Sequence, residues 1–88
     1  EGLGTEAARL ALRYAFEGIN LNRVEANVLS SNEASIRLLK RVGFTWEGKR
    51  RAAVWKSGQW EDMEIYGITA REWYESQEGG SEGPKRVS

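Results

Sequence analysis

Residues 23–44 have the sequence RVEANVLSSNEASIRLLKRVGF, and the patterns within this stretch decide the fold. In its first seven residues, RVEANVL, apolar Val24, Ala26 and Val28 alternate with polar Arg23, Glu25 and Asn27, which predicts a β-strand with one buried face. The polar turn Ser30-Ser31-Asn32 follows, and its side chains can cap the start of a helix. One face of that helix is formed by Ser35, Leu38, Leu39 and Val42. Gly43 is its predicted end, because glycine readily adopts the backbone conformation that ends many helices.

The segment before this stretch, GLGTEAARLALRYAFEG, predicts another helix, which begins near Thr5 and ends at Gly18. Four residues follow the spacing i, i+3, i+4 and i+7 of an apolar helix face. They are Ala7, Leu10, Ala11 and Tyr14. Gly2 and Gly4 precede this helix as a glycine loop, and a loop of this kind can bind an anion through backbone N–H groups. The alternative is a flexible N-terminus that holds two glycines by chance.

The segment after residue 43 predicts a β-hairpin. Residues 44–55 (FTWEGKRRAAVW) and 60–69 (WEDMEIYGIT) are the two strands, with a turn over residues 56–59 and a bulge or bend at Gly48. The sequence AREWYES then predicts a last helical turn. The remaining residues, 77–88, are rich in glycine, serine and charge and predict a disordered tail. The folded part is therefore a single domain over residues 1–76.

Composition excludes several kinds of site. The 88 residues contain no cysteine and no histidine, which excludes disulfides, zinc sites built from these residues, and Ser-His or Cys-His catalysis. Thirteen basic and thirteen acidic residues cancel. We therefore expect no nucleic-acid partner, although Lys49-Arg50-Arg51 with Trp46 and Trp55 leaves that alternative open. No segment resembles a signal peptide or a membrane span, so we expect a cytoplasmic protein with no membrane partner.

Two segments together resemble the C-terminal half of the GNAT superfamily of N-acetyltransferases, and the RimJ/RimL-type branch in particular. They are GLGTEAARLALRYAF and RVEANVLSSNEASIRLLKRVGFTWEGKRR. In that branch a Gly-x-Gly loop precedes Thr-Glu-Ala and a helix, and the second helix carries Asn-x-x-Ser before Gly-Phe. A hairpin with a Gly-x-Trp turn and an aspartate follows, matched here by Gly58-Gln59-Trp60 and Asp62. The resemblance covers residues 1–74. It implies an α/β (α+β) fold, helix–strand–helix followed by an antiparallel strand hairpin, as in the GNAT acyl-CoA N-acyltransferase fold.

The resemblance also implies a cosubstrate and a site. Acetyl-CoA would donate its acetyl group to a primary amine, such as a ribosomal-protein N-terminus, by direct attack in a ternary complex and without a metal. The backbone of Gly2, Leu3, Gly4 and Thr5 would bind the CoA pyrophosphate. Asn32 would contact the pantetheine arm or order the backbone around it. Ser35 would lie near the thioester as the catalytic hydroxyl, because Leu39 stands where many members carry a tyrosine; the alternative is a structural serine that bonds back to the preceding turn.

The resemblance further predicts a half-domain. The strand that would neighbour residues 23–28, and the general base that it usually supplies, fall outside the match. Glu25, Glu47 and Glu61 match no base position of the family, and we interpret them as surface carboxylates. An open sheet edge and an uncovered apolar face on the first helix would favour self-association into a homo-oligomer. The alternative to an enzyme is therefore a non-catalytic, self-associating half-domain with at most weak CoA binding.

Overall fold

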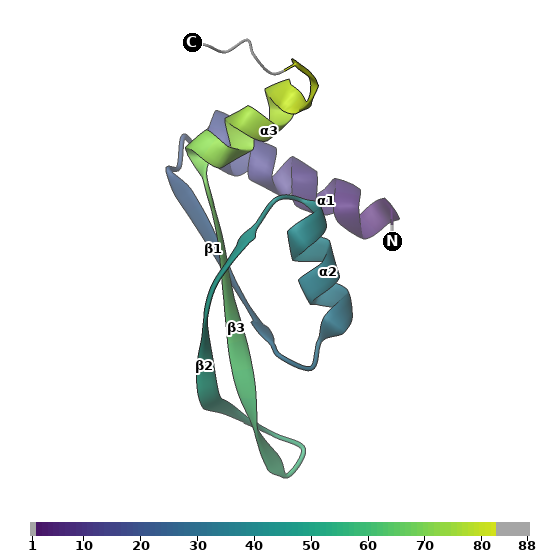
Figure 1. Ribbon diagram of the computed structural model, residues 1–88, viewed down its shortest axis with the longest axis vertical. Helices are drawn as coiled ribbons and strands as arrows, with labels where there is room; N and C mark the ends of the chain where they lie inside the picture. Colours follow the sequence, from purple (N-terminus) through teal and green to yellow (C-terminus); the bar gives the residue numbers. More distant parts are fainter. Residues whose placement is uncertain (1, 83–88) are drawn as a thin grey trace.

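A computed structural model describes residues 2–82 (Figure 1). Helices and strands follow in the predicted order of helix, strand, helix and hairpin, with a further helix at the end. They are α1 (Gly2–Arg13), the π-helical turn η1 (Tyr14–Gly18), β1 (Arg23–Leu29), α2 (Glu33–Arg41), β2 (Thr45–Lys56), β3 (Gln59–Thr69) and α3 (Ala70–Glu82). This order confirms the mixed α/β class. None of these helices is long and apolar enough to cross a membrane.

Within residues 2–82 the strands form one antiparallel sheet in the order β1-β3-β2. β1 pairs with β3 from Arg23 opposite Thr69 to Leu29 opposite Met63. Among the strands that the structure describes, β1 therefore has a hydrogen-bonding partner on one side only, in agreement with the open edge that the resemblance implied. An edge of this kind presents unpaired backbone N–H and C=O groups.

The β2–β3 hairpin contains a predicted bulge and a second irregularity that was not predicted. Its register shifts between Trp46 and Gly48, as expected, and again between Arg50 and Val54. Ala52 lies in this second irregularity with a φ of 48°. Its backbone N–H donates to Asp62 Oδ1 over 2.8 Å. Asp62, ten residues away in the sequence, thus stabilises the left-handed backbone conformation of Ala52. No local sequence signal indicates this conformation.

The core lies where the helices meet one end of the sheet. It is formed by Leu12, Phe16, Val42, Ile68 and Trp73. The rings of Phe16 and Trp73 stack with their centroids 6.0 Å apart. In Figure 1 the hairpin extends away from the helices, which gives the molecule its length of 51 Å. Trp55 and Trp60 near its tip are therefore exposed and contact each other edge to face.

α1 differs from the prediction at its start. The helix begins at Gly2, so Gly2, Leu3 and Gly4 form its first turn and are not a loop. Thr5 is buried, with 8% of its surface exposed. The glycines fit here because the first turn of a helix has few internal hydrogen bonds to lose.

α1 and the η1 turn that continues it carry two apolar faces. The predicted face is exposed, with Leu10 at 63% and Tyr14 at 64% of their surface open to solvent. A different face, with Leu12 and Phe16, packs into the core. The uncovered apolar face is therefore confirmed. The spacing could not tell which face meets the sheet, because both are apolar.

α3 is longer than the single turn predicted. Its start is fixed by a reciprocal pair of hydrogen bonds. The Glu72 N–H donates to Thr69 Oγ1, and the Thr69 N–H donates to Glu72 Oε1. This is the capping box signalled by a threonine three residues before a glutamate. The helix continues to Glu82, through the first part of the predicted tail, and residues 83–88 of that tail lie outside the described residues.

Candidate functional site

A pocket of about 310 Å³ lies between the first turns of α1 and the length of α2. It is lined by Gly4, Thr5, Ala34, Arg37, Leu38 and Arg41. Two of the predicted cofactor residues, Gly4 and Thr5, therefore line one cavity. Gly2 and Leu3 belong to the same first turn of α1. The first backbone N–H groups of a helix have no carbonyl partner within the helix and carry its positive dipole end, so this end of the pocket favours an anion.

Gly4 leaves space at the wall of this pocket. A Cβ atom at Gly4 would lie 4.0 Å from its nearest neighbour, the Cδ2 atom of Leu38. The backbone of α1 can thus be approached closely at this position. A larger side chain would project into the same space.

Two arginines add positive charge to this pocket. Arg37 and Arg41 lie one turn apart on α2 and both line the cavity. Neither forms an ion pair with any acidic side chain that the structure describes. Guanidinium groups bind phosphate in a bidentate geometry. The i, i+4 spacing of these two arginines on the predicted helix is the sequence signal that could have indicated the pair.

Asn32 caps α2, as predicted. Its Oδ1 atom accepts a hydrogen bond from the backbone N–H of Ser35 over 3.2 Å. The side-chain NH₂ group of Asn32 has no hydrogen-bond partner among the described residues, so it remains available as a donor. Asn32 does not line the pocket between α1 and α2.

Ser35 lies in the first turn of α2 and is partly buried. Its backbone N–H donates a hydrogen bond to the Asn32 side chain. No hydrogen bond joins its hydroxyl to another described residue, so the predicted alternative of a hydroxyl that bonds back to the turn is not observed. Ser35 lies next to the pocket residue Ala34 but does not itself line the cavity.

A carboxylate on β3 holds the turn from which α2 begins. Glu64 is 9% exposed and accepts hydrogen bonds from the Ser30 hydroxyl over 2.5 Å and from Trp46 Nε1 over 2.7 Å. Lys49 Nζ lies 3.6 Å from the same carboxylate. The bond from Ser30 and then the bond from Trp46 lower the pKa of Glu64, although burial opposes them. The sequence analysis did not identify this residue.

The three glutamates interpreted as surface carboxylates have partners. Arg23 bonds both oxygens of Glu47, at 2.8 and 2.5 Å, and also reaches Glu25 at 3.1 Å. These bonds from Arg23 lower the pKa of Glu47. Glu61 accepts a bond of 3.3 Å from the hydroxyl of Ser31. All three lie on the sheet, outside the pocket between α1 and α2.

Comparisons with known proteins agree with this arrangement. The profile of the acetyltransferase (GNAT) domain matches residues 1–45. The probable N-acetyltransferase YjcK of Bacillus subtilis is 43% identical over 68 residues, which are 77% of this chain and 38% of YjcK. The [ribosomal protein uS5]-alanine N-acetyltransferase of Escherichia coli is 34% identical over 73 residues, which are 83% of this chain and 38% of that enzyme.

A crystal structure of a probable acetyltransferase superposes with a TM-score of 0.78 at 38% identity. The superposition covers 83% of this chain and 41% of that protein. The chain thus spans about two fifths of the length of the relatives that it matches. Fold, family profile and sequence relatives agree, and the chain belongs to the GNAT family of acetyltransferases.

Proposed function

We propose that this chain is the acetyl-CoA-binding half of a RimJ/RimL-like N-acetyltransferase, whose complete domain acetylates a primary amine such as a protein N-terminus. The observation that carries this proposal is the pocket between α1 and α2, where a helix N-terminus meets two arginines that have no acidic partner within residues 2–82. The Escherichia coli relative is named for acetylating an alanine of a ribosomal protein. This name supports a protein N-terminus or another primary amine as the acceptor.

The residues of the pocket fit the phosphates of the cosubstrate. The backbone N–H groups at Gly2, Leu3 and Gly4 would hold the pyrophosphate, in the manner of anion sites at helix N-termini, and Thr5 would line the site beside them. Arg37 and Arg41 would neutralise the remaining phosphate charge. The side-chain NH₂ group of Asn32 would donate to the pantetheine arm, while its Oδ1 atom caps α2.

Ser35 would lie at the thioester end of the bound cosubstrate. Acetyl-CoA supplies a thioester whose carbonyl carbon the acceptor amine attacks. The Ser35 hydroxyl, which has no partner among the described residues, would donate a hydrogen bond to the departing thiolate. This role is electrostatic stabilisation, because an unassisted serine is a weak acid at neutral pH. The relatives are longer than the segment that this chain matches, and we assign the general base to the part of a complete domain outside that segment.

A second candidate is a non-catalytic half-domain that self-associates. The exposed side chains of Leu10 on α1 and Tyr14 on η1, together with the open edge of β1, favour this reading. In that case CoA binding would be weak and acetyl transfer absent. Titration with acetyl-CoA separates the two candidates.

The test is a titration of acetyl-CoA into the ¹⁵N-labelled chain. We expect saturable shifts of the backbone amides in residues 2–6 and 32–41. Gly4→Glu places a carboxylate where the phosphates would bind and should lower affinity by about tenfold or more. Arg50→Gln, on β2 and outside the pocket, is the charge control. Equal affinity of Gly4→Glu and the unmodified chain, with the fold intact, would refute the assignment.

A further inference from the structure

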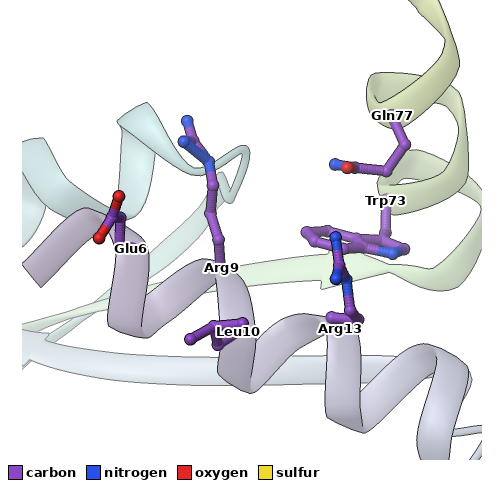
Figure 2. A pocket seen from close by; sticks show the side chains of 6 residues that line it. All are labelled: Glu6, Arg9, Leu10, Arg13, Trp73 and Gln77. Carbon is purple, nitrogen blue, oxygen red and sulfur yellow. The ribbon is translucent and has the colours of Figure 1, made fainter.

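A second pocket lies between α1 and α3 (Figure 2). Its volume is about 380 Å³, and it is lined by Glu6, Arg9, Leu10 and Arg13 of α1 with Trp73 and Gln77 of α3. It shares no lining residue with the pocket assigned to acetyl-CoA. A third hollow adjoins both pockets, because Arg9 and Gln77 of this second pocket and Arg41 of the first line it together.

Two hydrogen bonds from α3 position the walls of this second pocket. Trp73 Nε1 donates to Glu17 Oε2 over 3.1 Å, and the Tyr74 hydroxyl donates to the backbone oxygen of Phe16 over 3.1 Å. Both acceptors belong to η1, which continues directly from α1. α3 is thus held against the C-terminal end of α1, and the pocket between them is preformed.

The charge of this pocket comes from two arginines. Arg9 and Arg13 lie one turn apart on α1. Figure 2 shows both side chains on the side of α1 that faces Trp73 and Gln77 of α3. Arg13 has no ion pair or hydrogen bond with any residue that the structure describes. Arg9 has one long bond, of 3.4 Å, to the backbone oxygen of Arg41. Nearly all their N–H donors thus remain available for an anion.

The rest of the lining is largely apolar. Trp73 is only 2% exposed, so its indole closes the floor of this pocket, and the only polar group of the ring is bonded to Glu17. Leu10 is 63% exposed and adds an aliphatic side chain. Gln77 supplies a neutral donor and acceptor, and the Glu6 carboxylate makes no ion pair among the described residues. Such a lining suits a ligand with an anionic head and an apolar body.

We propose that this pocket binds a small organic anion. Arg9 and Arg13 hold its carboxylate or phosphate, and its apolar body packs on the exposed side chain of Leu10, above the floor that Trp73 closes. The volume lies near the lower end of the range for small-molecule pockets, about 300–1,000 Å³, which fits a ligand with one aromatic ring. The Glu6 carboxylate at the wall disfavours ligands with a second negative charge on that side. This site does not depend on the assignment of the acetyl-CoA pocket.

Phenylacetate is the probe, because it combines one carboxylate with one ring. Titration into the ¹⁵N-labelled chain should shift the backbone amides of residues 6–13 and 73–77 and the indole N–H of Trp73. Phenethyl alcohol lacks the charge and inorganic phosphate lacks the ring. Each should bind about tenfold more weakly or worse, because a charge-assisted hydrogen bond or a buried ring contributes at least that factor.

Arg13→Gln is the test variant, since it removes the charge and keeps most of the side chain. We expect a loss of affinity for phenylacetate of about tenfold or more. Arg37→Gln, in the other pocket, is the matched control and should leave this affinity unchanged. Circular dichroism of both variants verifies the fold. The proposal is overturned if phenylacetate produces no saturable shift at millimolar concentration, if the shifts centre on residues 34–41, or if Arg13→Gln binds as tightly as the unmodified chain.

Discussion

The hydroxyl of Ser30 at the end of β1 donates a hydrogen bond of 2.5 Å to Glu64 in the middle of β3. Trp46 on β2 donates to the other oxygen of the same carboxylate. One ionised side chain therefore joins all three strands of the described sheet at the point where the chain turns into α2. Through this turn, Glu64 determines where Asn32 and Ser35 lie relative to the sheet.

The pKa of Glu64 predicts how stability depends on pH. Hydrogen bonds lower the pKa values of Glu64 and Glu47 in the folded chain below their ordinary value of 4.5. The folded state therefore binds fewer protons than the unfolded state as the pH falls through this range. The free energy of unfolding should be constant at neutral pH and should decrease below about pH 4.5.

Urea denaturation followed by circular dichroism between about pH 7 and pH 3 measures this decrease. Glu64→Gln should lower the free energy of unfolding at neutral pH, and that free energy should then fall less steeply as the pH is lowered. Glu75→Gln, on the exposed side of α3, controls for the loss of one surface charge. If the free energy of unfolding of Glu64→Gln falls with pH as steeply as that of the unmodified chain, the role of the Glu64 carboxylate is contradicted.

Asn32→Ala removes the N-cap of α2. We expect a loss of about 1 kcal/mol in the free energy of unfolding, because the backbone N–H of Ser35 loses its acceptor. Asn32→Asp keeps the acceptor and should keep the stability, while it removes the NH₂ donor proposed for the pantetheine arm. Stability and acetyl-CoA affinity, measured on both variants, thus separate the two roles of this residue. The cap assignment fails if Asn32→Ala is as stable as the unmodified chain.

Gly43→Ala strains the end of α2. Gly43 has a φ of 107°, and a Cβ atom there would lie 3.4 Å from Ile68 Cδ1 in the core. We expect a destabilisation of about 1–3 kcal/mol from the backbone conformation. Gly4→Ala is the matched control, because Gly4 is helical and has space for a Cβ atom, and alanine there should leave stability equal or higher. Thermal unfolding of both variants tests this difference, and equal melting temperatures would contradict it.

The exposed apolar face of α1 predicts self-association. Tyr14→Lys places a charge at the η1 end of this face and should shift the chain toward the monomer in sedimentation velocity. Trp60→Lys, at the tip of the hairpin, replaces a similarly exposed aromatic residue and should leave the association unchanged. The prediction is contradicted by a chain that is monodisperse and monomeric at high concentration. Loss of association in Trp60→Lys alone would instead place the contact on the hairpin.

Local patterns predicted those parts of the fold that depend on neighbouring residues. β1 has the predicted bounds, Asn32 caps α2, and the register shifts at Gly48 as expected. Each of these follows from a strand period, a cap side chain or a glycine within a few positions. The capping box at Thr69 and Glu72 depends on a local pattern of the same kind, a threonine three residues before a glutamate.

Features that depend on distant residues could not be predicted in this way. The left-handed Ala52 depends on Asp62, and the ionised Glu64 depends on Ser30 and Trp46. The buried face of α1 was ambiguous, because both sides of the helix are apolar. At the candidate site, the family resemblance indicated Gly4 and Thr5, but only the packing of α1 against α2 placed Arg37 in the same pocket.

The turn between β2 and β3 has a consequence for the order of folding. Ser57 and Gly58 both have positive φ values, 52° and 81°, which is the type I′ geometry that matches the twist of a hairpin. This loop closes over two residues, whereas β1 meets β3 only after all of α2 and β2 have been spanned. The hairpin should therefore be formed in the folding transition state, and β1 should join afterwards. Destabilising changes at Gly58 should slow folding, while changes in β1 should mainly accelerate unfolding.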